Sequence, residues 1–164
     1  MALYTCPWPG QGFYFKKAVN SSADTQGIKF RSYNSATATF AEELGMVPVQ
    51  VEAAELSQAL ATGVAESFIS SGSTGYDRKV WESLTHYYKV NAWLPRNYVI
   101  VNKGIWDGLG ADTKANVQKA ADETGAACSA KSAELANWYF EQLSANGMSV
   151  EDASSDFLAE LEAI

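Results

Sequence analysis

From residue 28 onwards, short runs rich in β-branched and aromatic residues alternate with runs whose apolar residues recur at helical spacing. The runs predicted as strands are 28–33, 47–51, 65–70, 87–94 and 98–102. The runs predicted as helices are 36–44, 54–62 and 76–84. Strands that alternate with helices through short connections are typical of a mostly parallel sheet covered by helices on both faces. The expected fold class is therefore α/β.

A long helical run follows this alternation. Residues 112–146 have helical character almost throughout, with an apolar stripe at roughly helical spacing. Gly125 interrupts the stripe, which favours a bend at that point. At about 1.5 Å per residue this helix would span about 50 Å, more than a compact small domain needs. We therefore expect it to reach another part of the protein. An extended segment at 148–152 and a helix from Phe157 follow it.

Composition and charge exclude several classes of protein. The 164 residues are enough for one domain of ordinary size or one lobe of a larger protein. Hydrophobic residues make up 47% of the chain, which can supply a core, so disorder is not expected. The net charge of −7 argues against nucleic acid as a partner, because phosphate contacts need clustered Lys and Arg. No apolar run approaches the length needed to span a membrane.

The cysteines and the histidine indicate little chemistry. Cys6 and Cys128 have neither CxxC nor zinc-ligand spacing, and we expect two separate thiols rather than a bond between them. His86 is the only histidine, so a His-rich metal site is excluded and no metal or other cofactor is expected. A Ser-His-Asp centre would have to use His86, but two tyrosines follow it and favour a structural role.

Polar side chains gather where the predicted strands end. In open α/β sheets, ligands bind outside the carboxyl ends of the strands, where loops lead into helix N-termini. Arg31 lies close to the end of its strand and is followed by Asn34 at a helix start. The hydroxyl-rich loop 70–75 follows the third strand, and Trp93 lies near the end of the fourth. A guanidinium, an amide, hydroxyls and an aromatic face together suit a small carboxylate.

Each of these features also has a purely structural interpretation. Arg31 could be the ion-pair partner of Glu52 or Glu55. The serine-rich loop could only cap a helix, and Trp93 could belong to the core. The sequence alone leaves these alternatives open.

Three blocks of sequence carry a resemblance to a known family. GIKFRSYNSAT (27–37), VPVQVEAAELSQALATGVAES (47–67) and NYVIVNKGIWDGL (97–109) resemble the solute-binding subunits of tripartite ATP-independent periplasmic (TRAP) transporters. The similarity extends over nearly the whole chain, from residue 7 to residue 150. The resemblance implies a periplasmic-binding-protein-like fold, in which two α/β lobes close over an organic anion, usually a carboxylate. It also implies a periplasmic location, a membrane transporter as the partner, and no enzymatic activity.

The resemblance assigns roles to five residues. Arg31 matches the arginine that pairs with the substrate carboxylate, and Asn34 falls where some members use an amide. Gln11 matches a polar position that often makes a second contact to the carboxylate. Phe13 and Trp93 would line the body of the ligand.

One loop departs from the family pattern. Ser70 and Ser71 stand where many members have an Asn or an acidic-aromatic pair. We expect these serines to contact the ligand, and the departure argues against a sugar acid or a metal-assisted keto acid. The ligand is left unnamed.

Family members are about twice as long as this chain, consistent with two lobes of ordinary domain size. We expect residues 1–104 to be the arginine-bearing α/β lobe. Residues 105–164 would be the connecting helix and a truncated remainder of the other lobe. A cleft with a single wall would bind its ligand weakly, in about the millimolar range or worse. Trp138, Tyr139 and Phe140 would be uncovered on the long helix, which favours self-association.

Three functions compete at this point. The preferred one is the solute-binding lobe of a carboxylate importer. A ligand-sensing domain of the same ancestry would share every feature above but serve a signalling partner. A small α/β enzyme acting on an acid would need His86 as its base, yet His86 lies at the start of a strand rather than at its carboxyl end.

Overall fold

The computed structural model describes residues 1–164 and divides into two compact units. The α/β unit comprises Gly10–Trp93 and Tyr139–Ile164. The ribbon–helix unit comprises Met1–Pro9 and Leu94–Trp138. This division differs from the expected one at residue 104. Residues 1–9 and 94–104 group with the long helix, whereas residues 139–164 group with the α/β unit. Each unit is described by itself.

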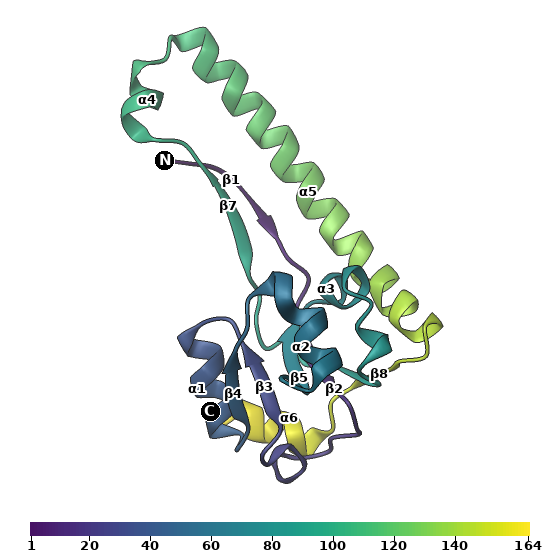
Figure 1. The fold of residues 1–164 in the computed structure, drawn as a ribbon. Coiled ribbons are helices and arrows are strands. Elements are labelled where there is room, and N and C mark those ends of the chain that lie inside the picture. The colour runs from purple at the N-terminus through teal and green to yellow at the C-terminus, as the bar shows by residue number, and fades with distance from the viewer. The chain divides into compact units, whose positions relative to one another are not determined.

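The α/β unit is built on a six-stranded sheet (Figure 1). Its strands, in spatial order, are β4 (Val47–Gln50), β3 (Lys29–Ser32), β5 (Ser67–Ser70), β2 (Gly12–Phe15), β6 (His86–Lys89) and β8 (Ser149–Asp152). The pairs β3–β4, β3–β5 and β6–β8 are parallel. Only β2 runs against its neighbours β5 and β6. The predicted mostly parallel sheet is confirmed, although the central strand β2 was not predicted.

Helices cover both faces of this sheet, as predicted. The helices of the unit are α1 (Ser35–Glu43), α2 (Leu56–Thr62), α3 (Gly72–Asp77), α6 (Ser155–Glu162) and the end of α5 (Ala111–Ala145). Short 3₁₀ turns lie at η1 (Ser22–Thr25), η2 (Ala53–Glu55) and η3 (Val80–Glu82). One buried cluster joins α2 and the end of α5 to the sheet, and a second joins α1 and α6 to it.

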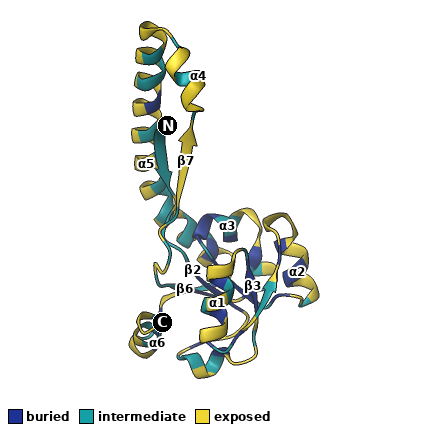
Figure 2. Ribbon diagram, turned by 90° about the vertical axis from the view of Figure 1, so that its left-hand side faces the viewer, coloured by how far each residue is buried: buried dark blue, intermediate teal, exposed yellow.

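Strand β2 supplies both clusters because successive side chains of a strand point to opposite faces. Tyr14 belongs to the cluster under α2, whereas Phe13 and Phe15 belong to the cluster under α1 and α6. All three side chains have no exposed surface. Figure 2 shows that buried residues gather on the strands of this unit, whereas α1 and α2 also carry exposed residues.

The third helix was predicted at the wrong place. The prediction was 76–84, but α3 begins at Gly72 inside the serine-rich loop and ends at Asp77. A Cβ atom on Gly75 would overlap the Tyr14 hydroxyl, so the absence of a side chain there lets the helix pack directly on the central strand. Lys79, at φ +50°, then turns the chain into the 3₁₀ turn η3.

The ribbon–helix unit contains β1 (Ala2–Pro7), β7 (Arg96–Ile100), α4 (Lys103–Gly108) and α5 up to Trp138. Strands β1 and β7 form an antiparallel two-stranded ribbon. Residues 98–102 were predicted as a strand of the same alternation, but β7 pairs with β1, which was not predicted, and not with the six-stranded sheet. Every residue of β7 is exposed (Figure 2).

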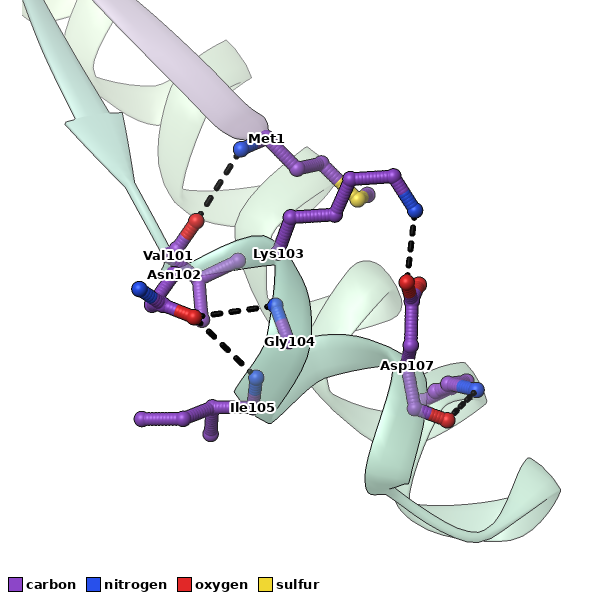
Figure 3. A network of polar contacts seen from close by, with 8 residues as sticks. Met1, Val101, Asn102, Lys103, Gly104, Ile105 and Asp107 are labelled. Carbon is purple, nitrogen blue, oxygen red and sulfur yellow. Dashed lines mark hydrogen bonds and ion pairs between the residues drawn. The ribbon is translucent and has the colours of Figure 1, made fainter.

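Polar contacts fix the segment after β7 (Figure 3). The amino group of Met1 donates to the carbonyl of Val101 at 3.0 Å. The side-chain oxygen of Asn102 accepts from the backbone nitrogens of Gly104 and Ile105 and so caps α4. Lys103 pairs with Asp107 at 2.6 Å one turn later.

None of the helices combines the length and the apolar character needed to cross a lipid bilayer.

The expectation of two separate thiols is wrong. Cys6 on β1 and Cys128 on α5 form a disulfide across 122 residues of sequence, with their Cα atoms 5.7 Å apart. Nearby, the Ser132 hydroxyl donates to the Pro7 carbonyl at 2.7 Å. Spacing rules find only ligands that are close in sequence, so they could not detect a pair joined by the fold.

Gly125 has a packing role rather than the expected role in a bend. Helix α5 continues through it without interruption. A Cβ atom at Gly125 would lie 3.0 Å from the Cβ of Tyr4, so the missing side chain lets β1 approach the helix closely.

The aromatic residues near the end of α5 are not all uncovered. The Phe140 ring lies 5.3 Å from the Tyr87 ring in the core of the α/β unit. Tyr139 lies 5.8 Å from the Tyr76 ring. Only Trp138 keeps substantial exposure, at 38%. The predicted apolar face is therefore smaller than expected, and self-association stays an untested prediction.

Candidate functional site

Arg31 is the centre of the candidate site. It is the third residue of β3, with β4 and β5 parallel on either side, so it lies near the carboxyl edge where ligands bind in such sheets. The residue is only 7% exposed. Its Nε donates to the carbonyl of Val51 at 2.9 Å. A nearly buried guanidinium needs partners, and this bond satisfies only one of its five N–H donors.

The alternative that Arg31 is an ion-pair partner is not supported. Four ion pairs occur in the structure and none includes Arg31. Burial lowers the pKa of the Arg31 guanidinium, and nearby Tyr33 and Glu52 raise it. Arginine titrates so far above neutrality that the group stays charged. Among the fully buried side-chain nitrogen and oxygen atoms, only the Ser67 hydroxyl lacks a hydrogen-bond partner. The terminal nitrogens of Arg31 also lack a partner but are not among these buried atoms, so they keep contact with the surface.

Tyr33 joins Arg31 to Gln11. The Arg31 guanidinium carbon lies 5.1 Å from the centre of the Tyr33 ring, and the Tyr33 hydroxyl donates to Oε1 of Gln11 at 3.2 Å. Burial raises the pKa of Tyr33, whereas Arg31 and the bond to Gln11 lower it; the net shift is upward. The hydroxyl therefore stays protonated at neutral pH and remains a donor. Two predicted site residues are thus brought together by one that was not predicted.

The backbone holds Gln11 in place. Its nitrogen donates to the carbonyl of Trp93 at 3.0 Å, and its carbonyl accepts from the nitrogen of Ala92 at 3.2 Å. These bonds place Gln11 just before β2 and beside the segment that follows β6. Tyr33 lies one residue past the end of β3, so the alternation of side chains along a strand could not place its ring against Arg31.

Asn34 is the N-cap of α1. Its side-chain oxygen accepts from the backbone nitrogen of Thr37 at 2.8 Å, and the Thr37 hydroxyl oxygen accepts from the backbone nitrogens of Asn34 and Tyr33. The side-chain oxygen is therefore already used within the chain, and only the amide nitrogen is left for a ligand. The exposed position of Asn34 at the helix start is compatible with that role.

Replacing Asn34 with alanine should lower the free energy of unfolding by about 1 kcal/mol, because one helix donor loses its acceptor. Asn34→Ser is the matched control, since it keeps an oxygen at the cap and should cost only a few tenths of that amount. Urea unfolding followed by circular dichroism measures both. Equal losses for the two variants would mean that the cap is not what the residue contributes.

The serine-rich loop satisfies its hydroxyls internally. Ser70 donates to the Thr74 hydroxyl at 2.8 Å, and Ser71 shares a hydrogen bond of 2.8 Å with Ser73. Ser71 is 1% exposed, and its carbonyl accepts from the Tyr14 hydroxyl. Ser71 is the N-cap residue of α3, but its side chain makes no capping bond. Of the two predicted ligand contacts, Ser70 keeps some surface, whereas Ser71 is enclosed.

Phe13 lies in the core rather than on the ligand surface. It has no exposed area, and its ring packs 5.7 Å from Phe15 and 5.8 Å from Phe40. The predicted role of Phe13 in lining the ligand conflicts with this burial, because the surrounding aromatic rings of the core enclose its side chain.

Trp93 is half-buried and meets Phe40 edge-on, with ring centres 5.1 Å apart. The two rings line an open hollow of about 690 Å³, together with Val90, Leu158 and Leu161. Arg31 does not line this hollow. The structure therefore connects Trp93 to the site through the backbone of Gln11, not through a shared cavity with the guanidinium.

His86 is remote from the carboxyl edge of the sheet. It is the first residue of β6, its Nδ1 lies 2.7 Å from the Thr85 hydroxyl, and its ring stacks 6.1 Å from Tyr88. No group of His, Cys, Asp and Glu could hold a metal ion. These contacts support the structural interpretation of His86.

Comparison with known proteins adds the family. The family described as bacterial extracellular solute-binding protein, family 7 (DctP), matches residues 11–164. The C4-dicarboxylate-binding periplasmic protein DctP of Rhodobacter capsulatus is 34% identical over 102 residues, which are 62% of this chain and 31% of that protein.

Two solved structures are similar in both sequence and fold. A TRAP solute binding protein from an unidentified marine microbe, specific for pyroglutamate and holding co-purified pyroglutamate, is 83% identical with a TM-score of 0.93. DctP6 of Bordetella pertussis, an extracytoplasmic solute receptor binding pyroglutamic acid, is 40% identical with a TM-score of 0.94. Each match covers 99% of this chain and 54% of the other, so this chain spans about half the length of the structures it matches.

The family match extends over nearly the whole α/β unit and most of the ribbon–helix unit. It agrees with the resemblance carried by residues 27–37, 47–67 and 97–109, and the similar structures share the predicted fold. The chain belongs to the DctP family of bacterial extracellular solute-binding proteins.

Proposed function

We propose that this chain is the arginine-bearing part of a solute receptor that captures a small organic carboxylate and delivers it to a TRAP membrane transporter. The observation that carries the proposal is the unpaired, nearly buried guanidinium of Arg31 at the carboxyl edge of the sheet. Fixed terminal nitrogens of an arginine match the two oxygens of a carboxylate, and a lysine could not reproduce that geometry.

Pyroglutamate is the carboxylate we propose. Both similar structures named above bind it, and one of them is 83% identical to this chain. Pyroglutamate has one carboxylate and a compact, uncharged ring, which fits a site with a single free cationic group. Family members act outside the cytoplasm, in agreement with the predicted periplasmic location. The receptor would carry out no reaction, because His86, the base that the enzyme alternative would use, lies on β6, three strands away from Arg31 on β3.

Replacing Arg31 with alanine should weaken pyroglutamate binding about 10–150-fold, the equivalent of 1.5–3 kcal/mol for hydrogen bonds to a charged group. Arg31→Lys should recover only part of this loss, because an ammonium cannot bind both oxygens in the plane of the carboxylate. Isothermal titration calorimetry measures the affinity. Arg78→Ala is the matched control, since Arg78 is an exposed arginine of the same unit whose side chain has no ion pair.

The titration should include 2-pyrrolidone, which keeps the lactam ring but lacks the carboxylate, and succinate as an acyclic acid. The whole set is measured with this chain and with a chain of the relatives' length. This chain spans about half of that length, and a ligand contacted from one side only is expected to bind weakly. Equal affinities for pyroglutamate and 2-pyrrolidone, or an unchanged affinity of Arg31→Ala, would contradict the proposal.

A further inference from the structure

We infer that Tyr33 is the positioning residue of the carboxylate site. Its ring holds one face of the Arg31 guanidinium, and its hydroxyl holds the side chain of Gln11, so that both side chains present their N–H groups to one ligand. The inference rests on the proposed function, because it takes the ligand to be a carboxylate.

Two contacts restrict the Arg31 side chain. An arginine side chain has many rotamers, and ordering it on binding costs conformational entropy. Here Nε is bonded to the Val51 carbonyl at 2.9 Å, and the guanidinium carbon lies 5.1 Å from the centre of the Tyr33 ring. The guanidinium is therefore bonded through Nε and lies over the Tyr33 ring before any ligand arrives. The terminal nitrogens form no hydrogen bond or ion pair with the chain and stay available.

Gln11 is held through both its backbone and its side chain. The backbone of Gln11 is bonded on both sides, to the Trp93 carbonyl and to the Ala92 nitrogen. Its side chain has one bond, in which Oε1 accepts from the Tyr33 hydroxyl at 3.2 Å. This bond uses one of the two lone pairs of the amide oxygen and turns that oxygen toward Tyr33, so the N–H₂ group is the end left to face a ligand. Tyr33 therefore decides which end of the Gln11 amide is free.

Arg31 and Gln11 offer a ligand the same kind of group. Arg31 has donors and no acceptor, and Gln11, once bonded to Tyr33, also presents donors. Two groups of donors suit a ligand that presents acceptor oxygens. An amine or a cation would meet only donors and a positive charge, which disfavours its binding. Tyr33 thus contributes to specificity without needing to touch the ligand.

Two substitutions separate the two functions of Tyr33. Tyr33→Phe keeps a ring over Arg31 but removes the bond to Gln11. Tyr33→Leu removes both. Tyr98→Phe is the matched control, because Tyr98 is a tyrosine on β7 that is 64% exposed.

The first test needs no ligand. The Nε–H proton of Arg31, bonded to Val51 and shielded from water, should exchange slowly in ¹⁵N-resolved NMR spectra. We expect Tyr33→Phe to leave this exchange nearly unchanged and Tyr33→Leu to accelerate it about 5-fold or more, because the covering ring is lost. The Nε–H proton of exposed Arg78 is the internal reference. An unchanged exchange rate in Tyr33→Leu would overturn the role of the ring.

The second test measures pyroglutamate affinity by calorimetry. Tyr33→Phe and Gln11→Ala should each weaken binding about 3–10-fold, the effect of one net hydrogen bond. The double variant should be no weaker than Gln11→Ala alone, because both changes remove the same interaction. Losses that multiply in the double variant would overturn the coupling between Tyr33 and Gln11.

Arg31→Ala separates a failure of the proposed function from a failure of the positioning role of Tyr33. If Arg31→Ala and Tyr33→Leu both bind like the unaltered protein, the proposed function fails. If Arg31→Ala loses affinity but Tyr33→Leu does not, only the positioning inference fails. If no affinity is measurable in any protein, the exchange rate of the Arg31 Nε–H proton still decides whether Tyr33 holds the guanidinium.

Discussion

Replacing Phe13 with alanine should lower the free energy of unfolding by about 3–5 kcal/mol, the cost of removing a buried aromatic side chain from a core. Phe13 has no exposed surface, and it lies on β2, the strand between β5 and β6. Its ring packs against four others, with centre distances of 5.7–6.1 Å to Phe15, Phe30, Phe40 and Phe157. The cavity left by alanine would open between the sheet, α1 and α6 at once.

Urea unfolding followed by circular dichroism measures this loss. Phe13→Leu is the matched control and should cost about 1 kcal/mol, because it conserves most of the apolar volume. The experiment also decides between the two roles of Phe13. If alanine changed stability by less than about 1 kcal/mol but weakened pyroglutamate binding strongly, Phe13 would be a ligand contact and its place in the core would be wrong.

Removing the disulfide should lower stability by about 2–5 kcal/mol, with the chain-entropy argument favouring the upper part of this range for so long a loop. The bond between Cys6 and Cys128 closes 122 residues of sequence. It also attaches β1 to α5, and a ribbon of two strands is only marginally stable by itself. A disulfide is expected in a family that acts outside the cytoplasm, because disulfides form and persist in oxidising compartments.

Thermal unfolding with and without a reductant measures this contribution. Cys6→Ser, Cys128→Ser and the double variant should melt at the same lowered temperature, and a reductant should lower the melting temperature of only the unaltered protein. A thiol assay under denaturing conditions is the control and should find no free thiol in the oxidised protein. Two reactive thiols, or no response to the reductant, would show that the bond does not form in solution.

Elements with a strong local period were predicted well. Strands 28–33, 47–51 and 65–70 and helices 36–44 and 54–62 agree with β3, β4, β5, α1 and α2 to within about two residues. The long helix 112–146 agrees with α5. In these segments the apolar positions recur with the period of the element that forms, so local sequence and tertiary packing favour the same structure.

Elements without such a period were missed. Strand β2 is four residues long and wholly buried, so GFYF shows no alternation of apolar and polar positions. Strand β1 has only intermediate burial and pairs with a strand about ninety residues away. Helix α3 was misplaced because its first residues, GSTG, are typical of a loop. A helix fits there because Gly75 has no side chain that would overlap Tyr14.

In the candidate site too, some features follow from local sequence and others depend on tertiary packing. The position of Arg31 at the carboxyl edge of the sheet follows from its place in the strand, and so does the start of a helix at Asn34. The sequence could not reveal that Val51 and Tyr33 hold the guanidinium, because each contact depends on how neighbouring segments pack. Phe13 was assigned to the ligand surface for the same reason: its burial depends on α6, which lies far along the chain.

The sequence by itself determined the α/β class, the long helix, and an arginine where such sheets bind ligands, because periods of 2 and 3.6 residues are local properties of the chain. Tertiary structure alone decided that β2 runs antiparallel in the middle of the sheet, that Cys6 meets Cys128, and that Tyr33 joins Arg31 to Gln11. Such contacts join segments that are distant in sequence. Their choice depends on the loop-closure entropy and the burial of the whole fold, which no local pattern contains.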